Sequence, residues 1–77
     1  MTPTAASPLA PAVDQPAHPL PALATFELDG YRRQLEHAIG FYDRTDPAAA
    51  ALAGLREHLA EAIAEQEDRA RIAARNA

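Results

Sequence analysis

The chain has 77 residues, is 48% hydrophobic, contains no cysteine and carries a net charge of −4. This length allows at most one small domain, and the lack of cysteine excludes disulfide bonds and thiolate chemistry. Nucleic acids bind to basic surfaces, so an acidic chain whose one basic doublet is Arg32-Arg33 is not expected to bind DNA or RNA.

Residues 1–24 hold six of the seven prolines, and alanine fills much of the rest. Proline removes a backbone donor and disfavours the α region for the residue before it, so this segment is predicted to be a disordered or extended tail. It precedes a helical region, residues 25–77. Two stretches match the PxxP pattern of docking ligands, Pro8–Pro11 and Pro16–Pro19, although flexible tails commonly contain the same pattern.

Residues 26–43 are predicted to form the first helix, with Thr25 as its candidate N-cap. Apolar residues recur at spacings of three and four along one side, as expected of a face that packs against another helix. These are Leu28, Tyr31, Leu35, Ile39 and Tyr42. A second, thinner stripe on the other side is predicted to contact a partner, because a helix that is apolar on two sides needs a second surface to cover it. Its members are Phe26, His37 and Phe41.

Residues 47–75 are predicted to form a longer second helix. Asp46 and Pro47 are typical of a helix start, because aspartate caps free N–H groups and proline fits the first helical position. The connector before them is short and polar, so the two helices are predicted to pack antiparallel as an all-α hairpin. The core-facing residues of this helix are Leu52, Leu55, Leu59 and Ile63. Its C-terminal end is expected to extend past the first helix, since the stripe weakens there to Gln66, Ala70 and Ala73.

The opposite side of the second helix carries an acidic ridge, formed by Glu57, Glu61, Glu65 and Asp68. Ile72 lies beside this ridge and is included in the predicted partner surface. Such a ridge keeps a helix soluble, and it can also bind a basic partner. The alternative function considered for the chain is therefore an acidic inhibitor or antitoxin-like protein that blocks a basic surface. Two pairs spaced four apart are expected to form ion pairs, Glu65–Arg69 and Glu67–Arg71.

No motif for catalysis, cofactor binding or metal binding is present in the sequence. The chain has three histidines, one serine and no glycine-rich loop, and a helical hairpin has no concave pocket of its own. We therefore expect no enzyme activity, small-molecule substrate, cofactor or metal. A pH- or metal-responsive role of His37 or His58 is a third alternative, because imidazole changes charge near neutral pH and ligates metals.

A lone two-helix hairpin buries few side chains, so its core is expected to be completed by a partner. A homodimer would form a four-helix bundle with coiled-coil packing, and docking on another protein would serve the same purpose. The sequence therefore predicts a small interaction or regulatory protein. No apolar run is long enough to span a bilayer and the first residues lack a secretory signal, so the expected location is the cytoplasm.

Overall fold

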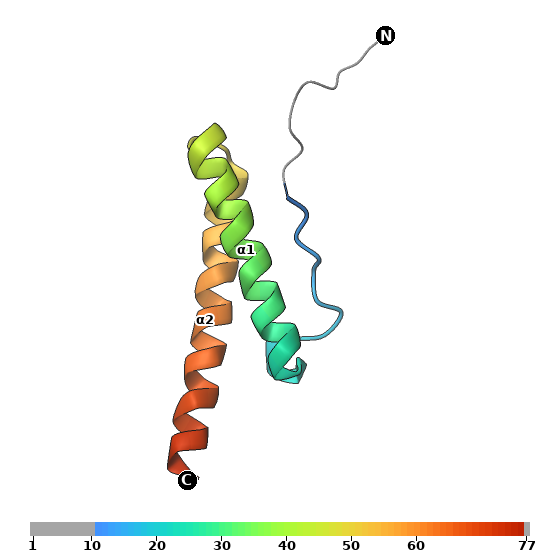
Figure 1. Cartoon of the computed structure of the whole chain (residues 1–77), viewed down its shortest axis with the longest axis vertical. Coiled ribbons are helices and arrows are strands. Elements are labelled where there is room, and N and C mark those ends of the chain that lie inside the picture. Colours follow the sequence, from blue (N-terminus) through green and yellow to red (C-terminus); the bar gives the residue numbers. More distant parts are fainter. Residues whose placement is uncertain (1–10, 77) are drawn as a thin grey trace.

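The computed structural model describes residues 11–76 as an antiparallel pair of helices with an extended segment laid against it (Figure 1). The predicted all-α antiparallel hairpin is confirmed. Residues 1–10 of the predicted tail, with the start of the first PxxP stretch, lie outside the described residues. The helical elements in chain order are the short 3-10 turn η1 (Leu20–Ala22), α1 (Thr25–Thr45) and α2 (Ala51–Arg75).

The first helix, α1, begins one residue before its predicted start, because Ala24 and not Thr25 takes the N-cap position. The backbone of Ala24 is extended, with φ −65° and ψ 158°. Its methyl side chain cannot accept a hydrogen bond, but its N–H donates to the carboxylate of Glu27 at 2.8 Å. The N–H of Leu28 then donates to the Ala24 carbonyl at 3.0 Å, and the regular helix continues from there.

The connector between the helices is longer than predicted, because α2 begins at Ala51 and not at residue 47. Asp46, expected to cap the second helix, instead ends α1, since its N–H donates to the Tyr42 carbonyl at 2.8 Å. The α region is disfavoured for a residue before proline, and Asp46 has φ −158° and ψ 75°. Its carbonyl accepts the Ala49 N–H at 2.9 Å, which closes a tight turn. The proline therefore lies in this turn, and α1 runs two residues past its predicted end.

Two polar contacts between the helices mark their antiparallel register. Arg32 Nη1 donates to Gln66 Oε1 at 2.7 Å, and near the connector Arg56 Nη2 donates to the Asp43 carboxylate at 2.6 Å. The hydrophobic core lies along the same interface and includes one residue of the segment before α1. Its buried members among the described residues are Leu23, Leu28, Tyr31, Leu35, Ala38, Leu52 and Ala62.

Two of these core residues, Ala38 and Ala62, are 1% and 0% exposed, as deeply buried as any leucine of the chain. A methyl side chain becomes inaccessible only where neighbouring groups approach it closely. The periodic pattern of large apolar residues did not predict them, because alanine is equally common on exposed helix surfaces. Close packing of the hairpin therefore depends on small residues as well as on leucines.

Residues 13–23, here named the strap, pack against one side of the hairpin. Leu23 is buried, and Val13 and Leu20 are partly buried against the core cluster. The backbone has polyproline-like angles at Pro19 (φ −58°, ψ 153°) and at Leu23 (φ −78°, ψ 143°). The expected extended conformation is present here. The strap's large apolar side chains are buried or half-buried against the hairpin.

The end of the hairpin where α1 begins and α2 ends is here named the open end. Figure 1 shows the helices diverging toward this end, with α2 reaching past the start of α1. Residues 70–76 are exposed, in agreement with the predicted extension of the second helix. Before that extension η1 contacts α2, so the strap fills part of the space that the diverging helices leave.

Candidate functional site

The residues predicted to form the packing face are covered to different degrees within the single chain. The buried ones are Leu28, Tyr31, Leu35 and Leu52. The half-buried ones are Ile39, Tyr42, Leu55, Leu59 and Ile63. This face is therefore used inside one chain, and its half-buried members keep apolar surface that a second molecule could cover. Leu23 was assigned to the tail, and no periodic signal in the sequence marks it as a core residue.

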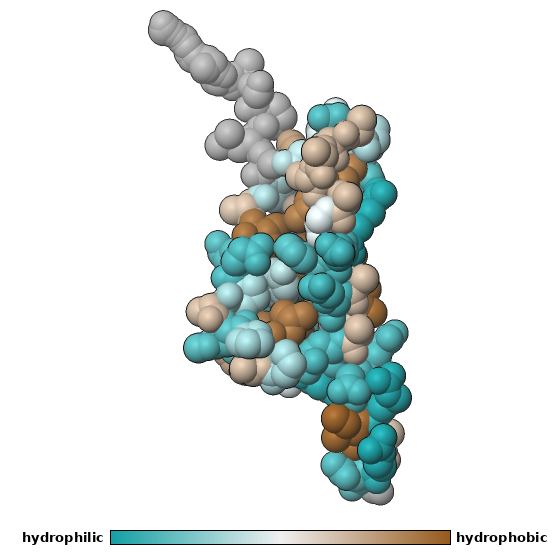
Figure 2. Space-filling view, turned by 180° about the vertical axis from the view of Figure 1, so that it is seen from behind, coloured by the Kyte–Doolittle hydropathy of each residue, from teal (hydrophilic) through white to brown (hydrophobic). Residues whose placement is uncertain are grey.

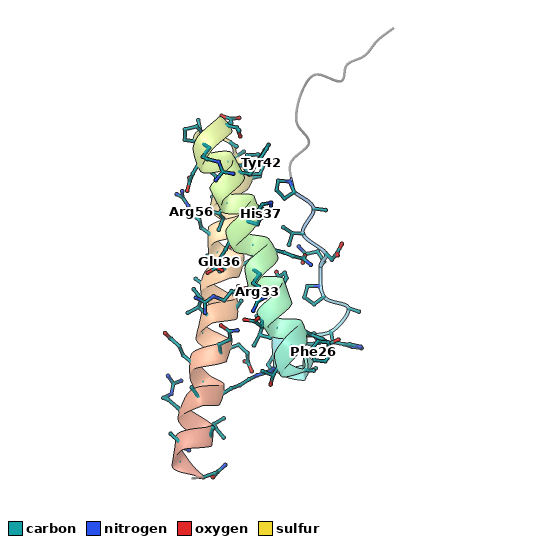
Figure 3. All side chains as sticks on the ribbon, viewed as in Figure 1. Phe26, Arg33, Glu36, His37, Tyr42 and Arg56 are labelled. Atoms are coloured by element: carbon teal, nitrogen blue, oxygen red, sulfur yellow. The ribbon has the colours of Figure 1, made fainter. Side chains whose placement is uncertain are left out.

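The predicted aromatic stripe on the far side of α1 is not one continuous apolar patch. Phe26 is 78% exposed at the first turn of α1, whereas Phe41 is half-buried. The Phe41 ring meets the edge of Tyr42, with the ring centroids 5.4 Å apart at 82°. His37 is exposed and lies three turns along α1 from Phe26, nearer the connector (Figure 3). Phe26 is thus the freely accessible apolar member of this stripe.

The acidic ridge of α2 is partly neutralised by arginines of the same helix. Arg69 Nε lies 2.9 Å from Glu65 Oε2, which confirms the first expected ion pair. Arg71 pairs with Asp68 at 2.9 Å, three residues earlier, and not with the predicted Glu67. Glu57 and Glu61 are exposed, and Ile72 beside the ridge is 45% exposed. The ridge therefore presents less free negative charge than its sequence indicates.

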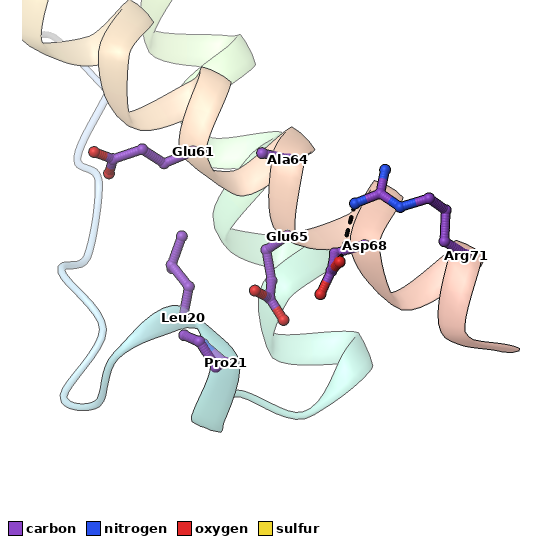
Figure 4. A pocket seen from close by; sticks show the side chains of 7 residues that line it. All are labelled: Leu20, Pro21, Glu61, Ala64, Glu65, Asp68 and Arg71. Carbon is purple, nitrogen blue, oxygen red and sulfur yellow. Dashed lines mark hydrogen bonds and ion pairs between the residues drawn. The ribbon is translucent and has the colours of Figure 1, made fainter.

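A shallow hollow of about 530 Å³ lies between the strap and this ridge (Figure 4). The strap contributes an apolar wall made of Leu20 and Pro21. The opposite wall comes from one side of α2 and consists of Glu61, Ala64, Glu65, Asp68 and Arg71. The hollow is open to solvent, so it is a surface depression between two elements and lacks the enclosure of a small-molecule pocket.

The aromatic ring and hydroxyl of Tyr31 belong to the buried core of the hairpin. Burial raises the pKa of the Tyr31 hydroxyl above its usual value, and the negative charge of Glu61 adds to the rise. His18 and His37 are exposed and His58 is half-buried. Within residues 11–76, no three histidine, aspartate or glutamate side chains come together in a way that could hold a metal ion.

The remaining surface is mixed in character. Figure 2 shows that hydrophobic side chains on the rear face occur as separate groups between hydrophilic ones. None of the helices in the described part of the chain combines the length and the hydropathy needed to cross a bilayer. Exposed large apolar side chains are limited there to Phe26 and Ile72. Both belong to the open end, because Phe26 lies in the first turn of α1 and Ile72 lies in the last turn of α2.

No known protein family, curated protein or solved structure matches this chain at a significant level.

Proposed function

We propose that this chain is a small, non-enzymatic helical interaction protein that docks on a second copy of itself or on another protein through apolar helix faces. Phe26 carries the proposal, because its side chain is 78% exposed on a chain that buries few large side chains. A phenylalanine buries roughly 150–250 Å² of surface when it is covered, and aromatic residues dominate interface energetics. Covering Phe26 would therefore stabilise a complex at the open end.

The thin core of the hairpin supports the same proposal. Only two large side chains, Leu28 and Leu35, are less than 2% exposed in the described part of the chain. The core stripe of α2 supplies one buried leucine, while Leu55, Leu59 and Ile63 stay half-buried. Single domains of this size are marginally stable, and oligomerisation is a common way to enlarge such a core.

A second copy of the chain is the simplest partner. Two hairpins related by a two-fold axis make a four-helix bundle, in which the same surface is used by both copies. The proposal therefore includes a homodimer, together with the cytoplasmic location expected from the sequence. The ridge-based inhibitor function remains the alternative, and the pairing of Glu65 and Asp68 with Arg69 and Arg71 makes it the weaker one.

The test is self-association of the full chain, measured by light scattering and circular dichroism over a dilution series. We expect Phe26→Ala to weaken association roughly tenfold, as for an interface hot spot, while helicity of the monomer stays unchanged. Glu57→Ala, an exposed change on the ridge, is the matched control and should leave association unaltered at low and high salt.

A dissociation constant that Phe26→Ala leaves within about twofold of the wild type would refute the docking role of Phe26. A steep loss of association with added salt, together with sensitivity to Glu57→Ala, would favour the acidic ridge instead, because exposed charge pairs are screened. A chain that remains monomeric at all concentrations would refute the homodimer.

A further inference from the structure

We propose that the side of the hairpin under the strap is a binding groove for an extended, proline-containing segment. In this structure residues 13–23 of the same chain occupy the groove, and Arg69 holds them by donating hydrogen bonds to their backbone carbonyls. The strap is then a ligand of its own hairpin. It keeps the groove closed to other segments of the same chemistry. This inference concerns a different surface from Phe26. Its test does not depend on whether Phe26 contacts a partner.

Arg69 is the centre of the polar recognition. Its Nη2 donates to the Leu20 carbonyl at 3.0 Å and to the Leu23 carbonyl at 2.8 Å. Its Nε donates to Glu65 Oε2 at 2.9 Å, so a carboxylate fixes the orientation of the planar guanidinium while Nη2 contacts the strap. Glu65 is therefore a positioning residue, and Arg69 is the group that contacts the bound segment.

Carbonyl recognition suits the turn η1 and the extended residue that follows it. The Leu20 carbonyl accepts the Leu23 N–H at 3.0 Å inside the turn and also accepts from Arg69, because a carbonyl oxygen has two lone pairs. The Leu23 carbonyl, which follows the turn on an extended backbone, accepts from the same arginine. The prolines Pro16, Pro19 and Pro21 lack N–H donors, so this stretch cannot lengthen α1 or add a regular strand to a sheet. An arginine donor and an acceptor-rich, donor-poor segment are complementary in chemistry.

Apolar contacts supply the second part of the recognition. Leu20 and Leu23 lie three residues apart around the turn η1, a spacing that places both side chains on one side. Leu23 is 8% exposed and belongs to the same buried cluster as Leu28, Tyr31 and Ala62. Val13 packs against this cluster from the other end of the strap. The groove therefore binds aliphatic side chains that are spaced along an extended segment and the short turn at its end.

The far end of the strap has one further polar anchor. The N–H of Asp14 donates to Gln34 Oε1 of α1 at 2.8 Å. Between the two anchors, the chain bends at Ala17 and His18, and both of these residues are exposed. The PxxP stretch that resembles a docking ligand is thus part of a segment docked on its own chain. A segment with so few polar anchors is suited to release.

A competing partner must share the chemistry of the strap. It is a proline-containing peptide that can form the same short turn, with two aliphatic side chains on one side and two carbonyls within reach of Arg69. A tethered ligand has an effective concentration on the order of millimolar, so such a partner binds well only when the strap is weakened or displaced. The strap therefore acts as an autoinhibitory segment of the groove.

The test uses the full chain with the strap weakened by Leu20→Asp and Leu23→Asp, and a fluorescent synthetic peptide of residues 11–24 as the probe. We expect the peptide to bind this variant at least roughly tenfold more tightly than it binds the wild type, whose groove is occupied. Adding Arg69→Gln should weaken binding roughly tenfold or more, as expected when hydrogen bonds to a charged group are lost. Arg75→Gln, an exposed change on the same helix, is the matched control.

Two results would overturn the proposal. One is equal affinity of the variant for this peptide and for a peptide that carries both aspartates, and the other is no binding by a variant that keeps its helicity.

If the double variant unfolds, a second measurement tests the proposal. Because the chain has no cysteine, spin labels can be placed at Ala22 and Ala60 by two single substitutions. We expect one narrow distance in the parent chain and a broad, longer distribution with Arg69→Gln. Unchanged distances would refute the role of Arg69.

Discussion

Replacing Ala62 with leucine tests whether the hairpin is closely packed at its small residues. The Ala62 side chain is 0% exposed and lies in the cluster formed by Leu23, Leu28, Tyr31 and Leu35. Leucine adds three carbon atoms where neighbouring atoms already surround the methyl group. Overpacking of this kind typically costs about 1–3 kcal/mol, because side chains leave their preferred rotamers and the backbones move apart.

Ala60→Leu is the matched control, since Ala60 is exposed on the same helix two residues earlier. Both variants make the same change in helix propensity, so the difference between them isolates the packing cost. We expect Ala60→Leu to change the free energy of unfolding by less than about 0.5 kcal/mol. Ala62→Leu should lower the free energy of unfolding by the larger amount derived above.

The assay is thermal and urea unfolding followed by circular dichroism at several protein concentrations, so that self-association is not mistaken for packing. For a chain of this size, each kcal/mol lost lowers the melting temperature by roughly 4–8 °C. Equal shifts for Ala62→Leu and Ala60→Leu would show that Ala62 faces open space. A more stable Ala62→Leu variant would show that the interface contains a void, and the reasoning from close packing would be refuted.

Three smaller effects can be measured by the same unfolding assays. Gly54→Ala should stabilise the chain by roughly 0.5–1 kcal/mol, because a Cβ there meets no atom within 4 Å, and destabilisation would contradict an exposed helical position. Ala24→Ser should add about 0.5–2 kcal/mol by supplying the missing cap acceptor opposite Glu27, and no gain would indicate a different start of α1. The raised pKa of Tyr31 contributes stability that is complete below the usual pKa of 10.0 and is lost as pH rises through the folded-state pKa. Tyr31→Phe should therefore flatten the fall in unfolding free energy at alkaline pH, and an unchanged profile would contradict the burial of this hydroxyl.

Periodicity along the chain was enough to predict both helices and most of the large side chains between them. Side chains three and four residues apart share one face of a helix whatever that face touches, so Leu28, Tyr31 and Leu35 were found without knowledge of their neighbours. The ion pair of Glu65 with Arg69 was predictable for the same reason. Such local rules apply before any tertiary contact forms.

Local rules were ambiguous at Asp46-Pro47, because a residue before proline is compatible with the end of one helix and with the start of the next. In the structure the Tyr42 carbonyl accepts the Asp46 N–H, so Asp46 ends α1 and does not cap α2. The second helix, α2, therefore begins four residues later than predicted. Ala62 posed a similar ambiguity, because an alanine is compatible with both the surface and the interior of a helical hairpin.

The position of the strap on the hairpin was determined by tertiary structure alone. Leu23 and Arg69 are 46 residues apart, and no pattern within either segment indicates that they meet. Their contact depends on which apolar surface remains uncovered once the helices have paired, and on the divergence of those helices toward the open end. Neighbouring residues determine the conformational preference of a segment. Its place in the fold is determined by surfaces that exist only after the rest of the chain has packed.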